Sequence, residues 1–283
     1  MTNRKYLVAI VLALLAAGGA SAGPNPWIVS EHSTQNPPLL RTYDYVQGSG
    51  MVTNPLNMPA GSMLGICGVE YVNNSVYLLG IAPNTLWTVT NGGGGQANLT
   101  AAVPNATPNS PEGDIGFNPA DGYMYVLENT AFTNVKSIWR INLALQTSTS
   151  IGTFTGDDPS GIAFDNAGNC IVVDTHGNTG GIAELLRFDV SGPNSQLLGR
   201  VSLGMGTGPA LGLDFDPTSN TPYLLDISGN LWTLSNYWAG TPSATLVERV
   251  GGLAIPNVTG LAYVPEPGSL ALLGLGLVLR RRR

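Results

Sequence analysis

The chain has 283 residues, and its 12 Lys and Arg against 18 Asp and Glu give a formal net charge of −6. Nucleic-acid-binding domains carry a clustered basic surface, whereas residues 24–264 contain a single lysine, Lys136. We therefore exclude a nucleic-acid partner.

The N-terminus has the three parts of a secretory signal peptide. Arg4 and Lys5 are basic, residues 6–17 are apolar, and Ala20-Ser21-Ala22 is a small-residue cleavage site. We therefore expect a signal peptide over residues 1–22 and a mature domain over residues 24–264. That domain has six basic and 17 acidic residues, because Arg4, Lys5, Arg280–Arg283 and Glu266 lie outside it, and its net charge is −11. Such a surface attracts cations and repels acidic polysaccharides unless a divalent ion bridges the two.

A repeat of about 48 residues organises this domain. Its first element has a small or acidic residue followed three positions later by an aromatic one, and successive aromatics are 46, 47, 51 and 48 residues apart. The five copies are Gly68-Val-Glu-Tyr71, Asp114-Ile-Gly-Phe117, Gly161-Ile-Ala-Phe164, Gly212-Leu-Asp-Phe215 and Gly260-Leu-Ala-Tyr263. After four of them come Asn, Asp, Gly and Pro residues that favour tight turns, and then further short strands.

This period, with about four strands in each unit, is typical of β-propeller blades. The fifth unit lacks its later strands, and residues 27–29, 39–41 and 51–53 of the N-terminal stretch could supply them. Closing a ring in this way removes exposed sheet edges. We therefore predict an all-β fold, a five-bladed β-propeller closed by strands from both termini, with an open β-array as the alternative. Cys67 and Cys170 fall on non-neighbouring units, so we expect two buried thiols without a disulfide.

The third unit also resembles a known family. Its sequence DPSGIAFDNAGNCIVVDTHGN, followed by LLRFDV, is similar to a blade of the NHL and gluconolactonase-like propellers. The resemblance implies the fold only, since such blades serve lyases, lactonases and binding modules alike.

The predicted strand directions assign the acidic residues to two faces of the ring. Asp121, Asp165 and Asp216 lie at the hairpin turns that follow the inner strands, and we call this side the turn face. Eight residues are expected around the channel mouth on the opposite face: Glu112, Asp114, Glu128, Asp157, Asp158, Asp174, His176 and Asp226. Ca²⁺ takes six to eight oxygen ligands, so Asp114, Asp157, Asp158, Asp174 and Asp226 are candidate calcium ligands.

Two other sets of side chains could bind or react with a ligand. Glu70 and Asp214 share one inner-strand position, where the other units have Gly or Ala, and a carboxylate pair could act as acid and base on a glycosidic or lactone bond. His176 is a further candidate base. Trp87, Trp139 and Trp232 share a repeat position that indicates packing, whereas Tyr237 and Trp238 have no counterpart and form a candidate carbohydrate platform.

The C-terminus combines Pro265-Glu266-Pro267, an apolar run over residues 270–279 and Arg280–Arg283. As a helix the ten apolar residues would span only about 15 Å, half of a bilayer core about 30 Å thick. Residues 265–283 resemble the PEP-CTERM sorting signal of exopolysaccharide-producing Gram-negative bacteria. The resemblance implies a transient inner-membrane anchor, cleavage near Pro265-Glu266-Pro267 by an exosortase-type protease, and delivery to the cell surface or extracellular matrix.

Together these features predict an exported, surface- or matrix-associated binding or scaffold module, with extracellular polysaccharide as a candidate partner. The alternative is a lactonase- or glycosidase-like hydrolase that uses acidic residues at the channel mouth.

Overall fold

A computed structural model describes residues 26–31, 39–44, 51–52, 56–93, 96–109, 113–129, 134–175, 183–203, 210–226, 229–249 and 258–264. The expected signal peptide, the sorting segment with Pro265, Glu266 and Pro267, and the candidates Glu112 and His176 lie outside these residues. Within the described ranges, no helix is long and apolar enough to cross a membrane.

The described elements are β-strands. The N-terminal stretch forms β1 (Pro26–Glu31), β2 (Leu39–Asp44), β3 (Met51–Val52) and β4 (Leu56–Asn57). The first two repeat units follow as β5 (Gly65–Val72), β6 (Ser75–Ile81), β7 (Leu86–Gly93), β8 (Gln96–Val103), β9 (Ile115–Asn118), β10 (Tyr123–Glu128), β11 (Val135–Asn142) and β12 (Thr147–Thr155). The remaining strands are β13 (Pro159–Phe164), β14 (Cys170–Asp174), β15 (Glu184–Asp189), β16 (Gln196–Ser202), β17 (Ala210–Asp216), β18 (Thr221–Asp226), β19 (Asn230–Ser235), β20 (Ser243–Arg249) and β21 (Val258–Tyr263).

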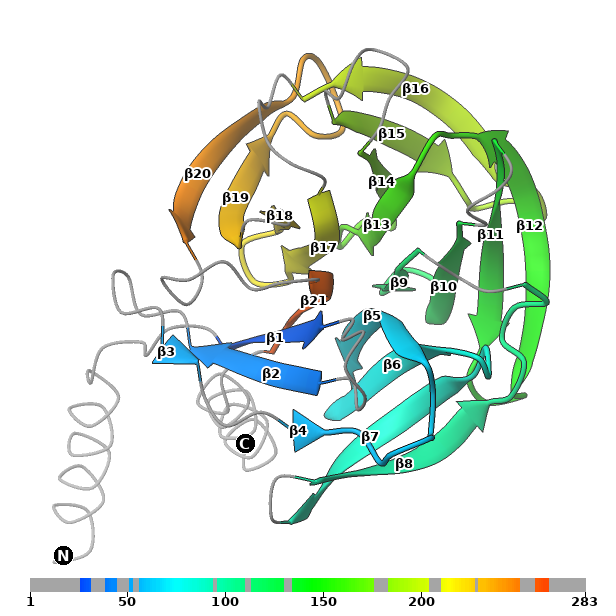
Figure 1. The fold of residues 1–283 in the computed structure, drawn as a ribbon. Coiled ribbons are helices and arrows are strands. Elements are labelled where there is room, and N and C mark those ends of the chain that lie inside the picture. The colour runs from blue at the N-terminus through cyan, green and yellow to red at the C-terminus, as the bar shows by residue number, and fades with distance from the viewer. Residues whose placement is uncertain are drawn as a thin grey trace, which may run out of the picture.

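These strands form a β-propeller, in which the sheets radiate from a ring of innermost strands (Figure 1). Units two, three and four are separate four-stranded antiparallel sheets. The prediction of five separate blades is corrected, because the described strands form four sheets: Asn57 of β4 pairs in parallel with Gln96 of β8 and joins the first unit to the closing strands in one nine-stranded sheet. The innermost strands β5, β9, β13, β17 and β21 nevertheless contact one another in sequence around the centre.

Closure by strands from both termini is confirmed. β21 pairs with β1 in antiparallel register, with Trp27 opposite Tyr263, and β1 pairs with β2, which pairs in turn with β3. The predicted segments at residues 27–29 and 39–41 thus fall on β1 and β2, and residues 51–52 of the third segment form β3, whereas residue 53 lies outside the described residues. The N-terminal strands supply the hydrogen-bonding partner that the C-terminal strand would otherwise lack.

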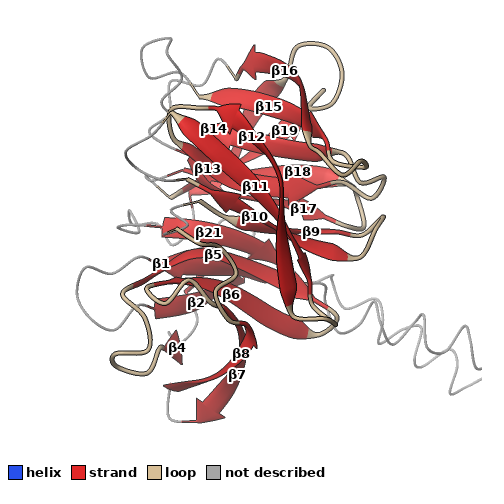
Figure 2. Ribbon diagram, turned by 90° about the vertical axis from the view of Figure 1, so that its right-hand side faces the viewer, coloured by secondary structure: helices blue, strands red, loops and turns tan. Residues whose placement is uncertain are grey.

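The hairpins after the inner strands gather on one side of the ring, seen edge-on in Figure 2. Asn73 and Asn74 have φ values of 50° and 62°, as a two-residue hairpin turn with positive φ at both positions requires. Asp165 accepts hydrogen bonds from the backbone N–H groups of Ala167 and Asn169, and Asp216 accepts one from that of Thr218. The predicted turn-forming role of these aspartates is confirmed.

The hydrophobic cores lie between neighbouring sheets and draw residues from both. One core joins Tyr125 of the second unit to Ile162 and Phe188 of the third. The inner strands approach so closely that a Cβ added at Gly212 would lie 2.7 Å from the backbone nitrogen of Leu261. This contact explains the small residue that begins most repeats. Cys67 and Cys170 are buried and form no disulfide, as expected.

Candidate functional site

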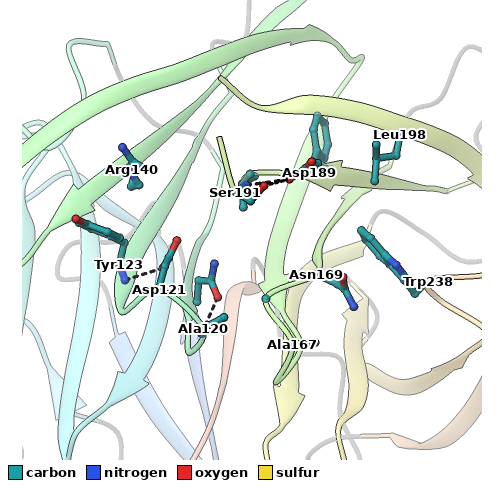
Figure 3. A pocket seen from close by; sticks show the side chains of 14 residues that line it. Ala120, Asp121, Tyr123, Arg140, Ala167, Asn169, Asp189, Ser191, Leu198 and Trp238 are labelled. Atoms are coloured by element: carbon teal, nitrogen blue, oxygen red, sulfur yellow. Dashed lines mark hydrogen bonds between the residues drawn. The ribbon is translucent and has the colours of Figure 1, made fainter. Parts of the chain in front are cut away.

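A groove on the turn face is the larger of the two cavities described here. It has a volume of about 530 Å³ and lies between the second and third units (Figure 3). Its polar and aromatic walls include Asp121, Tyr123, Arg140, Asn169 and Asp189, together with Trp238, one of the predicted platform residues. Volumes of roughly 300 to 1,000 Å³ are typical of small-molecule sites, so the groove is large enough for a short oligosaccharide segment.

Hydrogen bonds and ring contacts hold the groove side chains in place. Asp121 accepts hydrogen bonds from the backbone N–H of Tyr123 (3.0 Å) and the hydroxyl of Tyr125 (2.6 Å). The Arg140 guanidinium lies 5.0 Å from the centre of the Tyr123 ring, within cation–π range. Hydrogen bonds from Ser191 lower the pKa of the exposed Asp189, which favours its carboxylate form. The groove therefore offers both charged acceptors and aromatic surface.

The loop that carries Tyr237 and Trp238 is fixed by an arginine from the neighbouring unit. The Arg187 guanidinium donates hydrogen bonds to the carbonyl oxygens of Tyr237 (2.6 Å), Asn236 (3.2 Å) and Gly240 (3.0 Å). The Tyr237 hydroxyl donates to Asp165, and its ring packs edge-on against Phe215 at 5.2 Å. Partial burial, and then Asp165, raise the pKa of Tyr237 to about 12. Tyr237 therefore packs within the protein, and Trp238 is the member of the predicted pair that lines the groove.

The second cavity also lies on the turn face, where it forms one mouth of the central channel. The channel mouth for which the eight residues are predicted is the other one, on the opposite face. It holds about 100 Å³ and is lined by Glu70, Asp214 and the aromatic residue of every repeat copy. Those aromatic residues are Tyr71, Phe117, Phe164, Phe215 and Tyr263. The repeat's aromatic position thus forms a ring of aromatic side chains around the opening, with two carboxyl groups beside it.

Glu70 and Asp214 make equivalent contacts in two units. Glu70 accepts hydrogen bonds from its neighbour's backbone N–H, at Tyr71 (2.8 Å), and from that of Phe117 on the next inner strand (2.9 Å). Asp214 accepts the corresponding pair from Phe215 (2.7 Å) and Tyr263 (2.6 Å). Each carboxyl group thereby links two inner strands.

Burial dominates the electrostatics of this pair. Desolvation raises the pKa of Glu70 well above its usual value, and the charge of Asp214 raises it further. Desolvation likewise raises the pKa of Asp214 to about 7, although the hydrogen bonds from Tyr263 and Phe215 oppose the rise. A carboxyl group with a pKa of about 7, as Asp214 has, can exchange protons near neutral pH.

Asp114 adds a third carboxyl group near this pair. It is fully buried and accepts a hydrogen bond on Oδ1 from the backbone N–H of Ile115 (2.9 Å), and the backbone of Ile162 also stabilises its carboxylate. Its pKa is raised well above the usual value, first by burial and then by the charges of Glu70 and Asp214. Asp114 therefore interacts with the central pair and not with the other candidate calcium ligands.

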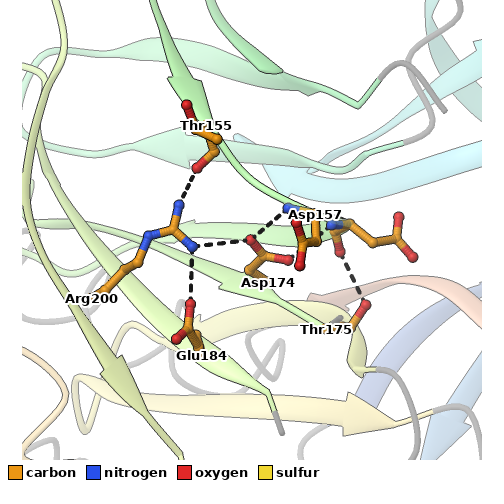
Figure 4. Close-up of polar contacts among 7 residues, drawn as sticks. Thr155, Asp157, Asp174, Thr175, Glu184 and Arg200 are labelled. Carbon is orange, nitrogen blue, oxygen red and sulfur yellow. Dashed lines mark hydrogen bonds and ion pairs between the residues drawn. The ribbon is translucent and has the colours of Figure 1, made fainter. Parts of the chain in front are cut away.

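Three of those candidates lie together on the opposite face. Asp174 accepts hydrogen bonds from the backbone N–H groups of Asp157 (3.1 Å), which is labelled in Figure 4, and of Asp158 (2.9 Å). Arg200 lies 3.5 Å from Asp174, forms a 2.9 Å ion pair with Glu184, and also donates to the carbonyl oxygen of Thr155. The arginine therefore supplies a positive charge beside Asp174.

Asp226 lies apart from them and has structural partners. Its carboxylate accepts hydrogen bonds from the Asn230 backbone and side chain and from Trp232 Nε1 (3.0 Å). Glu128, at the equivalent position of the second unit, likewise accepts a hydrogen bond from Trp139 Nε1 (2.9 Å). Among the described residues, no group of three or more His, Cys, Asp or Glu side chains is arranged to hold a metal ion.

Sequence reasoning did not identify three of the groove residues. These residues are Tyr123, Arg140 and Asp189. The sequence did contain one signal for this groove. Asp121 and Asn169 both lie at hairpin turns after inner strands, and these turns belong to the same face of the ring. Aromatic and polar residues from several units meet there only after the ring has closed.

Comparison with known proteins is informative about the tail and the fold. A family model described as the PEP-CTERM protein-sorting motif matches residues 264–283, which indicates an exported protein that is processed at the membrane by an exosortase, a protease. The expected resemblance of residues 265–283 to this signal is therefore confirmed. No curated protein matches the sequence significantly.

Solved structures with a similar architecture are distant in sequence. A protein described as a gluconolactonase has a TM-score of 0.50 and 15% identity, over 85% of this chain and 84% of that one. A protein described as a 6-phosphogluconolactonase, from Bacteroides uniformis, has a TM-score of 0.48 and 16% identity, over 79% and 68%. TolB from Acinetobacter baumannii has a TM-score of 0.45 and 11% identity, over 83% of this chain, which spans 52% of the TolB chain. The likeness to gluconolactonase-type propellers is thus confirmed for the fold alone.

Proposed function

We propose that this protein is an exported glycan-binding module that works at the cell surface or in the extracellular polysaccharide matrix. An exosortase-type protease would release it from a transient membrane anchor, in keeping with the motif at residues 264–283. The observation that carries the proposal is the groove of about 530 Å³ in which Trp238 lies among hydrogen-bonding side chains.

The groove has the two kinds of surface that a sugar needs. The C–H faces of a pyranose ring can pack on Trp238 and Tyr123, because both are flat and apolar. Its hydroxyl groups can donate hydrogen bonds to the carboxylates of Asp121 and Asp189. These carboxylates and the mature domain's charge of −11 favour a neutral glycan over an acidic one.

Binding to polysaccharides tests the proposal. The purified protein is titrated with neutral and acidic oligosaccharides, and the variants Trp238→Ala and Asp121→Asn are compared with it. We expect each variant to lose about tenfold or more in affinity, which corresponds to about 1.4 kcal/mol. Trp87→Phe is the matched control, because Trp87 Nε1 has no hydrogen-bond partner and the residue lies outside the groove. Equal glycan affinity in Trp238→Ala and the parent protein would contradict the proposal.

A hydrolase is the second candidate function, and the raised pKa values of Glu70 and Asp214 favour it. One protonated and one ionised carboxyl group could act as acid and base on a lactone or glycoside. A screen of both substrate classes separates the two functions. Turnover that disappears in Glu70→Gln or Asp214→Asn, but persists in Trp238→Ala, would favour the hydrolase.

A further inference from the structure

The channel mouth on the turn face has a composition unlike that of the groove. Its walls are five aromatic residues and the carboxyl groups of Glu70 and Asp214, with two prolines and Asn166. Its lining contains no Lys, Arg or His side chain. A concave site with aromatic walls and only acidic charges attracts cations, because aromatic faces and carboxylates both present negative potential.

The carboxyl groups at this place have no positively charged side chain beside them in the cavity lining. Glu70 is 6% and Asp214 9% exposed, and Asp114, which interacts electrostatically with both, is fully buried. Glu70 and Asp214 each accept two hydrogen bonds from backbone N–H groups, which carry no net positive charge. Ionising a buried carboxyl group without a counter-charge costs free energy, and a bound cation would recover that cost.

We propose that the channel mouth binds a small organic ammonium cation, with Glu70 and Asp214 facing the positive charge and the ring of aromatic side chains enclosing its alkyl groups. An anion would be repelled by an ionised carboxyl group here, and a neutral ligand would not stabilise the ionised form, whereas a cation would. A hard metal ion needs six or more oxygen ligands, and most of this lining is carbon. The cavity of about 100 Å³ corresponds to roughly three waters at about 30 Å³ each, which suits one methylated ammonium group.

A cation and a neutral molecule of the same shape test this site directly. The purified full-length protein is titrated calorimetrically with choline and with 3,3-dimethylbutan-1-ol, its neutral isostere, at constant ionic strength. We expect saturable binding of choline and at least tenfold weaker binding of the alcohol. Absence of choline binding, or equal binding of both probes, would overturn the proposal.

Variants locate the site. Glu70→Gln and Asp214→Asn should each weaken choline binding at least tenfold, and Phe117→Leu should weaken it through the loss of one aromatic wall. Asp121→Asn is the matched control, because it removes a carboxylate from the groove on the same face and should leave choline affinity unchanged. Circular dichroism confirms that each variant is folded, and any variant that unfolds is replaced by Tyr71→Leu. Choline binding that is unaltered in all folded channel variants would overturn the assignment.

The two binding proposals can fail independently. Loss of glycan binding in Trp238→Ala with retained choline binding supports the ammonium site, since that site is separate from the groove. Calcium provides a further comparison at the same ionic strength. If Ca²⁺ displaces choline at equal concentration, the site selects charge and not an alkylated ammonium group, and the proposal is wrong.

Discussion

Two acidic side chains at one repeat position illustrate how single residues tie this ring together. Glu70 reaches Phe117, and Asp214 reaches Tyr263, each through a backbone N–H of the next inner strand. The units with Gly116, Ala163 or Ala262 at this position lack such a side chain. The two links therefore combine a structural role with a pair of buried carboxyl groups at a repeat position that is Gly or Ala in the other units.

The raised pKa of Asp214 predicts how stability changes with pH. Its pKa is about 7 in the folded protein against a usual value of 3.8, so between these values the folded state binds more protons than the unfolded state. The free energy of unfolding must then fall as pH rises from about 4 to about 7 and stay low above that range. The difference between the two pKa values corresponds to a loss of about 4 kcal/mol.

Asp214→Asn should flatten this pH dependence, because an amide does not ionise. Urea unfolding at pH 5 and at pH 8 measures this dependence. The difference in the free energy of unfolding between the two pH values should be smaller in the variant than in the parent. Glu70 and Asp114 titrate nearby with raised pKa values and account for the part that remains. Asp189→Asn, at an exposed carboxylate with a lowered pKa, is the control that should keep the parent's dependence over this range. If the free energy of unfolding of Asp214→Asn depends on pH as steeply as that of the parent, Asp214 is not a source of the pH dependence.

At the scale of the strand, packing between inner strands determines which residues the repeat can accept. Gly161 and Gly212 begin two of the inner-strand copies, and an added Cβ would lie 2.8 Å from the Leu213 Cβ in the first case and 2.7 Å from the Leu261 nitrogen in the second. Backbone and Cβ atoms of a neighbouring inner strand cannot move aside as the far end of a flexible side chain can. These glycines are therefore required by close approach between strands.

Gly212→Ala should destabilise the protein by about 1–3 kcal/mol, the usual cost of overpacking in a filled core. Gly199→Ala on the outer strand β16 is the matched control, because an added Cβ there meets no atom within 4 Å. Chemical denaturation of both variants measures the difference. Equal stability of the two variants would show that the inner strands can separate at little cost.

For the whole molecule, closure depends on pairing between the two ends of the described chain. β21 pairs with β1, and β21 also contacts β17 and β5 on either side. Deletion of residues 24–57 removes β1 to β4 and leaves one side of β21 without its hydrogen-bonding partner. An open sheet edge in the middle of a ring exposes both backbone groups and the neighbouring core.

The deletion should therefore abolish cooperative unfolding or lower the midpoint of thermal unfolding by well over 10 °C. Circular dichroism with temperature measures it, and a chain lacking only residues 1–22 is the control. A truncated chain that unfolds at the parent's temperature would contradict closure.

The fold could be predicted from this sequence to a greater extent than the site. The aromatics at residues 71, 117, 164, 215 and 263 identify the inner strands because one strand position recurs in each unit. The number of sheets could not be read in the same way, because the single pair Asn57–Gln96 that merges two units leaves no pattern in the repeat.

The groove was harder to predict because its residues are far apart in the chain. Asp121 and Trp238 are separated by more than 100 residues and share no local motif, so only the closed ring shows that they line one cavity. The contact of Glu70 with Phe117 is similarly non-local. Turn formation by Asp121 could be predicted because it depends on neighbours in sequence, whereas its place in a groove depends on the packing of other units.

The tail gives a last prediction for the whole molecule. Residues 264–283 match a sorting motif whose processing releases exported proteins at the membrane, and Val264 is the last residue after β21 that the structure describes. Because β21 ends at Tyr263, cleavage near Pro265-Glu266-Pro267 would leave the innermost strands intact. We therefore expect a mature surface or matrix form that has lost Arg280–Arg283, which intact-mass analysis of that fraction measures. Glu266→Ala should shift the protein to the membrane fraction with its tail retained. A surface form of the parent that still carries Arg283 would show that the motif is not cut in this protein.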